Sequence, residues 1–423
     1  MWRSGPRCGG LRAAVGHRML RRRFAGISIC VVSTSLSLLP AEAGSHVQQE
    51  VASAPAPVFD ALRTRAERAR ADGRLDEALA AYGEAVILQP SWIEGHWYLG
   101  TMYYETGRFR ECRDAFGRVV SLQQENGAAW AFKGLCEFQV RDYASAMADL
   151  ERGRELGVGD SPELVAVVRF HDAMLATRAG RYEGALQDLA GFARQGNTSE
   201  ELALALGLAL LRMPQVPAEI VPGQREMVLT AGRALLVSGG RASADAVKAL
   251  ARLAEKYPDA PNVHYAYGLF LTAEHPDEAL EQFRQELRIS PDHAMARVQI
   301  AQEQLKRGER EAALPLATEA ARLAPDNFVA RRLLGQLRLE TGDAQGAIAE
   351  LESAKQLQPD SPSVRFQLAR AYQRAKRTAD AERERAEFTR LERELRVQRG
   401  GSNAVGDLEA TPAEAAPPPP RQR

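Results

Sequence analysis

Proline recurs at a fixed step of 34 residues near the end of the chain, at Pro291, Pro325 and Pro359. The same step separates three further pairs: Gly308 and Gly342, Ala313 and Ala347, Ala301 and Gly335. A period kept by several residue types at once indicates a repeated supersecondary unit. Glycine suits a turn at the end of a first helix, and proline ends a second helix. We therefore expect each unit to be a helical hairpin.

Earlier parts of the chain carry the same marks. They are Gly73, Ala78, Tyr82 and Pro90; Leu99, Gly100, Tyr103, Gly107 and Phe116; Trp130, Gly134, Tyr143 and Ala146; and Gly180, Tyr182 and Ala185. Alanine, leucine, glutamate and arginine dominate the composition, whereas aromatic residues make up only 6%. An excess of helix formers favours an all-α fold.

This pattern over residues 59–391 resembles the tetratricopeptide repeat family. The resemblance implies an all-α, right-handed superhelical solenoid of about nine helical hairpins with a C-terminal capping helix. Stacked hairpins share one continuous core, so we expect nearly all glycines and prolines to be architectural. The turn glycines should adopt the left-handed conformation: Gly73, Gly107, Gly180, Gly308 and Gly342.

Changes in composition divide the chain into six segments. They are a signal peptide (1–43), a flexible lead-in (44–57), N-terminal hairpins (58–196), degenerate hairpins (197–258), C-terminal hairpins with the capping helix (259–397), and a disordered Ala/Pro-rich tail (398–423). Within the degenerate segment, the loop 212–224 holds three prolines and cannot be a regular helix. It is either a surface insertion, protruding or draped over its hairpin, or a lid over a groove.

The N-terminal segment has the organisation of a secretory signal. Residues 1–41 contain no acid but include the run Arg21-Arg22-Arg23, and an apolar stretch then leads to small residues around Ala43. We expect cleavage after Ala43, with Met19 as a possible true start, and hence a periplasmic or secreted protein. An uncleaved membrane anchor, a twin-arginine signal and a mitochondrial transit peptide are the alternatives.

No motif of a known catalytic, nucleotide-binding or metal site is present. The seven histidines are scattered, so we expect no metal, no cofactor and no enzyme activity, although a site assembled across repeats stays open. Lysine plus arginine equals aspartate plus glutamate at 55 each, which disfavours a nucleic-acid partner. Cys112 and Cys136 remain after processing, and a disulfide between them is conceivable in an oxidising compartment.

The resemblance also implies that the first helices of successive hairpins line a concave groove for a protein or peptide. Carried onto this sequence, the groove comprises Trp97, Tyr98, Thr101, Tyr104, Phe132, Leu135, Phe138, Phe170, Met174, Tyr265, Leu269, Val298, Gln302, Arg332, Gln336, Phe366 and Arg370. We expect about half of these side chains to pack in the core. The N-terminal part is aromatic, and the C-terminal part is polar and mildly basic.

Some members of the family hold a peptide carboxylate with paired lysine and asparagine. Here the equivalent positions hold Arg63 and Glu67, Trp97 and Thr101, Ala131 and Leu135. This departure disfavours such a clamp, so an extended or helical apolar ligand is expected in the N-terminal groove. The leading hypothesis is a non-catalytic interaction scaffold of the cell envelope, without an integral membrane segment after processing. The alternative is an accessory or regulatory subunit of an envelope assembly system or of glycan or cofactor biosynthesis.

Overall fold

The computed structural model describes residues 56–237 and 243–403, and every regular element in this part of the chain is a helix. The chain divides into two compact units, Met1–Leu253 and Ala254–Arg423, and the boundary between them in the sequence falls within α12 (Ala244–Lys256). The first unit contains α2 (Ala56–Ala71), α3 (Leu75–Leu88), α4 (Ile93–Thr106), α5 (Phe109–Leu122), α6 (Gly127–Gln139), α7 (Tyr143–Leu156), α8 (Pro162–Arg178), α9 (Tyr182–Arg194), α10 (Glu200–Leu210), the 3₁₀ turn η2 (Pro217–Glu219) and α11 (Pro222–Val237). The second contains α13 (Val263–Leu271), α14 (Pro276–Ile289), α15 (Ala294–Lys306), α16 (Arg310–Leu323), α17 (Phe328–Glu340), α18 (Ala344–Leu357), α19 (Pro362–Arg374) and α20 (Thr378–Asn403).

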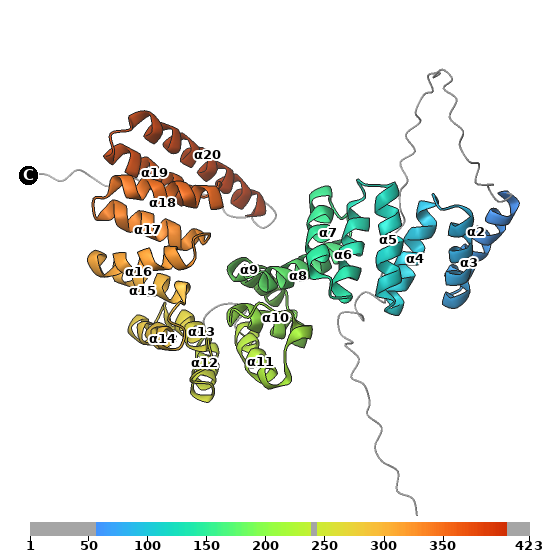
Figure 1. Cartoon of the computed structure of the whole chain (residues 1–423), viewed down its shortest axis with the longest axis horizontal. Coiled ribbons are helices and arrows are strands. Elements are labelled where there is room, and N and C mark those ends of the chain that lie inside the picture. Colours follow the sequence, from blue (N-terminus) through green and yellow to red (C-terminus); the bar gives the residue numbers. More distant parts are fainter. Residues whose placement is uncertain (1–55, 238–242, 404–423) are drawn as a thin grey trace, which may run out of the picture. The chain divides into compact units, whose positions relative to one another are not determined.

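Consecutive helices pair as antiparallel hairpins, and each hairpin packs against its neighbour within its unit (Figure 1). The pairs are α2 with α3, α4 with α5, α6 with α7, α8 with α9, α10 with α11, α13 with α14, α15 with α16, α17 with α18, and α19 with α20. The prediction of an all-α fold built from consecutive hairpins is therefore confirmed for the described residues.

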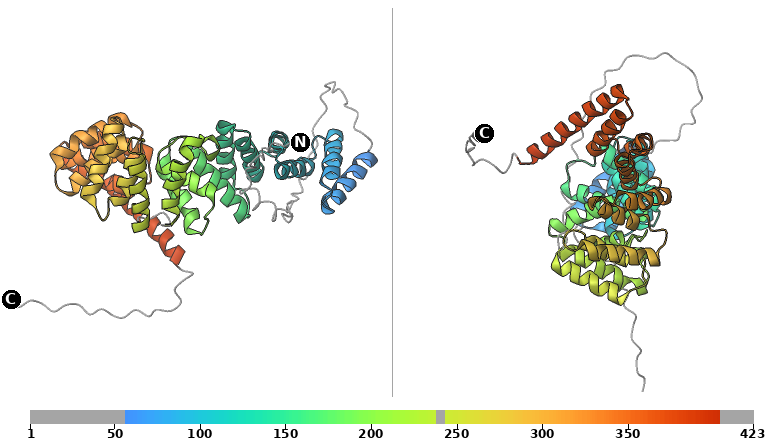
Figure 2. Two further views of the ribbon diagram at one scale, coloured as in Figure 1. Left: turned by 90° about the horizontal axis from the view of Figure 1, so that it is seen from below. Right: turned by 90° about the vertical axis from the view of Figure 1, so that its left-hand side faces the viewer.

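Several predicted segments fall wholly or partly outside the described residues. The signal peptide of residues 1–43, with its cleavage site after Ala43 and the possible start at Met19, lies outside them. So do residues 44–55 of the lead-in and 404–423 of the tail. The tail was expected to begin at residue 398, but α20 continues to Asn403 (Figure 2) because no proline interrupts the chain before Pro412.

The five turn glycines all adopt the left-handed backbone conformation that the sequence predicts. Their φ angles lie between 71° and 96°, for Gly73, Gly107, Gly180, Gly308 and Gly342. At the same position of two other hairpins, Arg141 and Lys376 adopt φ angles of 66° and 60°. The geometry of the turn is thus kept even where a side chain makes that backbone conformation costly.

Small residues in the first helix let the two helices of a hairpin cross closely. A Cβ atom added to Gly134 of α6 would lie 2.9 Å from the Leu150 side chain of α7, and one added to Gly335 of α17 would lie 2.6 Å from Leu351 of α18. Both distances are shorter than van der Waals contact, so a larger residue would force the helices apart. These glycines are therefore architectural, as expected.

The hairpin of α10 and α11 is closely packed although its repeat pattern is weak in the sequence. A Cβ atom at Gly207 would lie 1.9 Å from the carbonyl oxygen of Val228, so the two backbones touch. The loop between these helices lies against the unit instead of protruding. Val216 is completely buried, and Glu219 forms an ion pair with Arg178 of α8 at 3.2 Å.

A disulfide bond joins Cys112 of α5 to Cys136 of α6. The Cα atoms are 6.0 Å apart, within the range that disulfides span, and both side chains are completely buried. Because α5 and α6 belong to consecutive hairpins, the bond links one repeat covalently to the next.

Candidate functional site

Eight of the predicted groove residues are buried in the hairpin cores. They are Trp97, Tyr104, Phe132, Leu135, Phe138, Met174, Tyr265 and Val298. The Trp97 ring meets Phe116 and Phe132 edge-on at 5.4 and 5.7 Å between ring centroids, and Phe116 stacks on Phe132 at 5.0 Å. Such contacts stabilise the junction between hairpins. These aromatic side chains therefore fill the core between repeats and leave little of their surface for a ligand.

The remaining N-terminal groove residues are half-buried. Tyr98 lies under the guanidinium of Arg70, 4.1 Å from the ring centroid, and Phe170 packs edge-on against Phe192 at 5.5 Å. Thr101 bonds back to the carbonyl of Tyr98 at 3.0 Å. Among the described residues of the first unit, the predicted groove side chains are thus buried or half-buried and form no continuous exposed aromatic surface.

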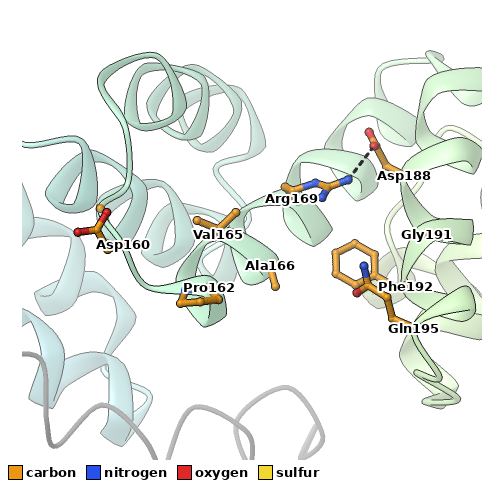
Figure 3. Close-up of a pocket in the computed structure, with 10 residues that line it drawn as sticks. Asp160, Pro162, Val165, Ala166, Arg169, Asp188, Gly191, Phe192 and Gln195 are labelled. Atoms are coloured by element: carbon orange, nitrogen blue, oxygen red, sulfur yellow. Dashed lines mark hydrogen bonds and ion pairs between the residues drawn. The ribbon is translucent and has the colours of Figure 1, made fainter. Parts of the chain in front are cut away.

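A cleft of about 460 Å3 opens between α8 and α9 in the first unit (Figure 3). Phe192 occupies the position that Gly153 occupies in α7, where a small residue allows close approach of α6 and α7. The Phe192 ring lines the cleft opposite Val165 and Ala166 of α8, and Arg169 and Asp188 form an ion pair across it at 3.5 Å. The cleft therefore lies where this hairpin has a large side chain and the preceding hairpin has a glycine.

A buried charged cluster links α6 to α7. Lys133 donates to Glu137 at 2.8 Å and also bonds to Asp149. Burial and the neighbouring Asp149 carboxyl raise the pKa of Glu137 to about 7, against the opposing effect of Lys133. One ammonium group thus balances two carboxyl groups, and partial protonation of Glu137 near neutral pH relieves the excess negative charge.

The second unit has an open groove of about 440 Å3 along its first helices. It is lined by Gln302, Leu305, Lys306, Arg310, Arg332, Leu333, Gln336 and Glu340, which come from α15, α17 and the start of α16. Gln302, Arg332 and Gln336 are predicted groove residues, and the structure brings them together. Gln302 and Gln336 are one repeat apart, so α15 and α17 each contribute a side-chain amide at the equivalent position of the hairpin.

Arg332 is the one arginine lining this groove that has no ion pair or hydrogen bond with the described residues. Its side chain is half-buried, and burial lowers its pKa. By contrast, Arg310 forms an ion pair with Glu340 at 2.8 Å. The hydrogen bonds that Glu340 accepts from Arg310 and Gln336 outweigh burial and keep its pKa low. The groove consequently carries an uncompensated positive charge.

The predicted residues Phe366 and Arg370 lie on α19, the next first helix of this unit. Phe366 is 49% exposed and packs against Phe388 of α20 with ring centroids 5.6 Å apart. Arg370 is exposed, with its guanidinium 5.8 Å from the Phe366 ring centroid, and its charge contributes to the low pKa of Glu340. A hydrogen bond of 3.3 Å from Gln367 to Gln336 connects α19 to α17.

Sequence reasoning missed one row of groove residues. Lys306 and Glu340 stand 34 residues apart, as Gln302 and Gln336 do, and each follows its glutamine by four residues. Residues four apart share one helix face, so this row could have been found from the same period. Arg310, on the second helix, could not, because its position depends on how the hairpin closes.

No group of three or more histidine, cysteine, aspartate or glutamate side chains that could hold a metal ion occurs within the described residues. In the same part of the chain, none of the helices has the length and apolarity needed to cross a membrane. The site is therefore a charged surface groove on a helical repeat scaffold.

Comparison with known families identifies this scaffold. A tetratricopeptide repeat model matches residues 98–157, 229–294 and 298–362. These matched segments are tetratricopeptide repeats, which form scaffolds that mediate protein–protein interactions and are typically non-catalytic.

Several solved structures are similar to parts of the chain. Residues from 41 onward of MamA from Desulfovibrio magneticus RS-1 are 22% identical, covering 41% of this chain and 97% of that one, with a TM-score of 0.36. Yeast Tom70 is 13% identical, covering 79% and 85%, with a TM-score of 0.32. The Naa15/Naa10 complex bound to HypK-THB gives 12% identity, 82% and 67% coverage, and a TM-score of 0.32. No curated protein sequence matches the chain.

Proposed function

We propose that the chain is a non-catalytic scaffold that binds a protein or peptide partner in the groove of the second unit. The observation that carries this proposal is the unpaired guanidinium of Arg332 in an open groove lined by side-chain amides. A half-buried charge without a counter-ion is costly in the free protein. A ligand that supplies the counter-ion recovers this cost on binding.

The distribution of exposed side chains supports the second unit over the first. Arg332 is half-buried and Phe366 and Arg370 are exposed, whereas Trp97, Phe132 and Phe138 in the first unit are buried. A partner makes its strongest contacts with side chains that it can reach in the folded protein. The aromatic residues of the first unit contribute instead to the stability of the stack.

A photo-crosslinking amino acid at position 336 of the full-length chain, in its native cell, tests the binding site. The expected result is one discrete adduct that is absent when the same amino acid replaces Arg288, an exposed residue of α14 whose hydrogen bond goes to Gln285. No adduct at position 336, or the same adducts at both positions, would contradict the proposal.

The proposed location is the periplasm or the extracellular space. The segment of residues 1–41 supports it, because it has no acid and is rich in arginine and then apolar, and so does the bond between Cys112 and Cys136. Disulfides form and persist mainly in oxidising compartments.

Mass spectrometry of the protein isolated from its native cell tests the location. The expected N-terminus follows Ala43, and denatured protein should react with a thiol-blocking maleimide only after reduction. An N-terminus at Met1 or Met19, together with labelling of both Cys112 and Cys136 without reduction, would place the protein in a reducing compartment.

A further inference from the structure

We infer that the groove of the second unit selects an acidic peptide segment, one whose aspartate or glutamate side chains reach Arg332 and Arg370. This inference rests on the proposed function and adds the chemical class of the partner. The neighbouring charges favour it because the carboxylates beside the groove are already engaged. Glu303 bonds to Lys306 and Arg307 at 3.2 and 3.0 Å, and Glu340 bonds to Arg310.

The other two arginines of α17, Arg331 and Arg338, form ion pairs within the unit. Arg331 donates to Glu350 of α18 at 2.6 Å, and Arg338 lies 3.6 Å from the same carboxylate. These two side chains have partners on the adjacent second helix. Arg332, next to Arg331 in sequence, turns to the groove and has no such partner among the described residues.

Arg332 and Arg370 lie on either side of an interhelical amide contact. Gln336 is one helical turn after Arg332, it accepts a hydrogen bond from Gln367 at 3.3 Å, and Arg370 follows Gln367 by three residues. The two positive charges are therefore spread along the groove, across successive first helices. An extended peptide with several carboxylates matches this arrangement better than a single terminal carboxylate does.

The amides give the groove a way to hold the backbone of such a peptide. Gln302 makes no side-chain hydrogen bond with the described residues, and it stands one repeat before Gln336. A side-chain amide can both donate to a peptide carbonyl and accept from a peptide N–H. The combination of amides for the backbone and arginines for acidic side chains fits a polypeptide.

Selection from a displayed library of random twelve-residue peptides, with the full-length mature protein as bait, tests the preference. The expected outcome is an excess of aspartate and glutamate in the enriched peptides relative to the input library. The excess should disappear with the variant Arg332→Gln/Arg370→Gln but persist with Arg288→Gln, which removes an exposed arginine of the same unit. Equal circular dichroism spectra verify that the variants fold.

Fluorescence anisotropy with the most enriched peptide then gives the size of the effect. Replacing its acids by amides should weaken binding at least tenfold to the wild type but less than threefold to Arg332→Gln. Enriched peptides without an acidic excess, or an equal effect of the amide peptide on both proteins, would overturn the inference and leave a groove of another specificity. The absence of any enrichment would overturn it too, while cross-linking at position 336 decides the proposed function separately.

Discussion

The carboxylate of Glu286 on α14 accepts a hydrogen bond of 2.9 Å from the backbone N–H of Asn262, the residue that precedes α13. The other carboxylate oxygen accepts the N–H of Tyr265 at 3.3 Å. Glu286 is completely buried at a position where later repeats have alanine. It accepts hydrogen bonds at the N-terminus of α13, where the N-cap residue Asn262 makes no side-chain capping bond.

Removal of this carboxylate should destabilise the second unit. We expect Glu286→Ala to lower the free energy of unfolding by about 2 kcal/mol or more, because two buried N–H groups lose their acceptor. Glu286→Gln should cost less, since the amide oxygen can still accept one bond. Hydrogen exchange of residues 262–271 by mass spectrometry measures both variants, and equal protection in Glu286→Ala and wild type would refute the capping role.

Glu137 should make the first unit less stable as the pH rises. Burial and Asp149 raise its pKa from 4.5 in the unfolded chain to about 7, so the folded state holds the proton more tightly. Stabilisation present below pH 4.5 is then lost as the pH rises through 7. We expect Glu137→Gln to be more stable than wild type by about 2–3 kcal/mol at pH 8, with little difference at pH 4.5.

The measurement is urea unfolding followed by tryptophan fluorescence, since Trp92, Trp97 and Trp130 all lie in the first unit. Lys133→Met is the matched control, because it leaves two buried carboxyl groups without their cation and should be less stable than wild type at pH 8. A Glu137→Gln variant that is destabilised at pH 8 would show that the ionised carboxylate is favourable.

His171 should make the first unit less stable as the pH falls, the opposite of the effect of Glu137. Burial lowers its pKa from 6.5 to about 4, while Nδ1 donates to the carbonyl of Val167 at 2.8 Å and Phe138 packs edge-on at 4.7 Å. The folded state therefore disfavours protonation, and stability is lost as the pH falls from 6.5 towards 4. We expect His171→Phe to remove about 2 kcal/mol of the stability change between pH 7.5 and pH 5. An unchanged pH profile would mean that the imidazole is hydrated.

Two glycine-to-alanine substitutions should show how a close backbone contact and helix propensity each affect the free energy of unfolding. Gly207→Ala should destabilise the α10–α11 hairpin by several kcal/mol, because the new methyl group overlaps the Val228 carbonyl. Gly117→Ala in α5 meets nothing within 4 Å and should stabilise the protein by about 0.5–1 kcal/mol. Thermal unfolding by circular dichroism compares them, and a Gly207→Ala variant as stable as Gly117→Ala would rule out the backbone contact.

The sequence predicted the hairpins well because glycine, alanine and proline obey local rules. The turn glycines needed a left-handed backbone, and the period placed Gln302, Arg332 and Gln336 on one face. Burial of the aromatic residues was harder to predict. Trp97 and Phe132 lie on first helices, but each fills the gap to the neighbouring repeat, and this depends on how closely the hairpins stack.

Charge pairing across helices also lay beyond sequence reasoning. Arg331, Arg332 and Arg338 look alike in the chain, yet only contacts with α18 show which of them are paired. Glu286 is a similar case. A glutamate at an alanine position looks like an interruption of the repeat until its carboxylate is seen to accept the backbone N–H groups of Asn262 and Tyr265.

The affinity of the partner captured at position 336 for charge-reversed variants tests the central claim most directly. Titration calorimetry with Arg332→Glu should show binding at least tenfold weaker than wild type, about 1.4 kcal/mol or more. Arg288→Glu, which makes the same change of charge on α14, should bind within twofold of wild type. Equal affinities for wild type and Arg332→Glu, or equal losses in the two variants, would contradict a partner-binding groove at Arg332.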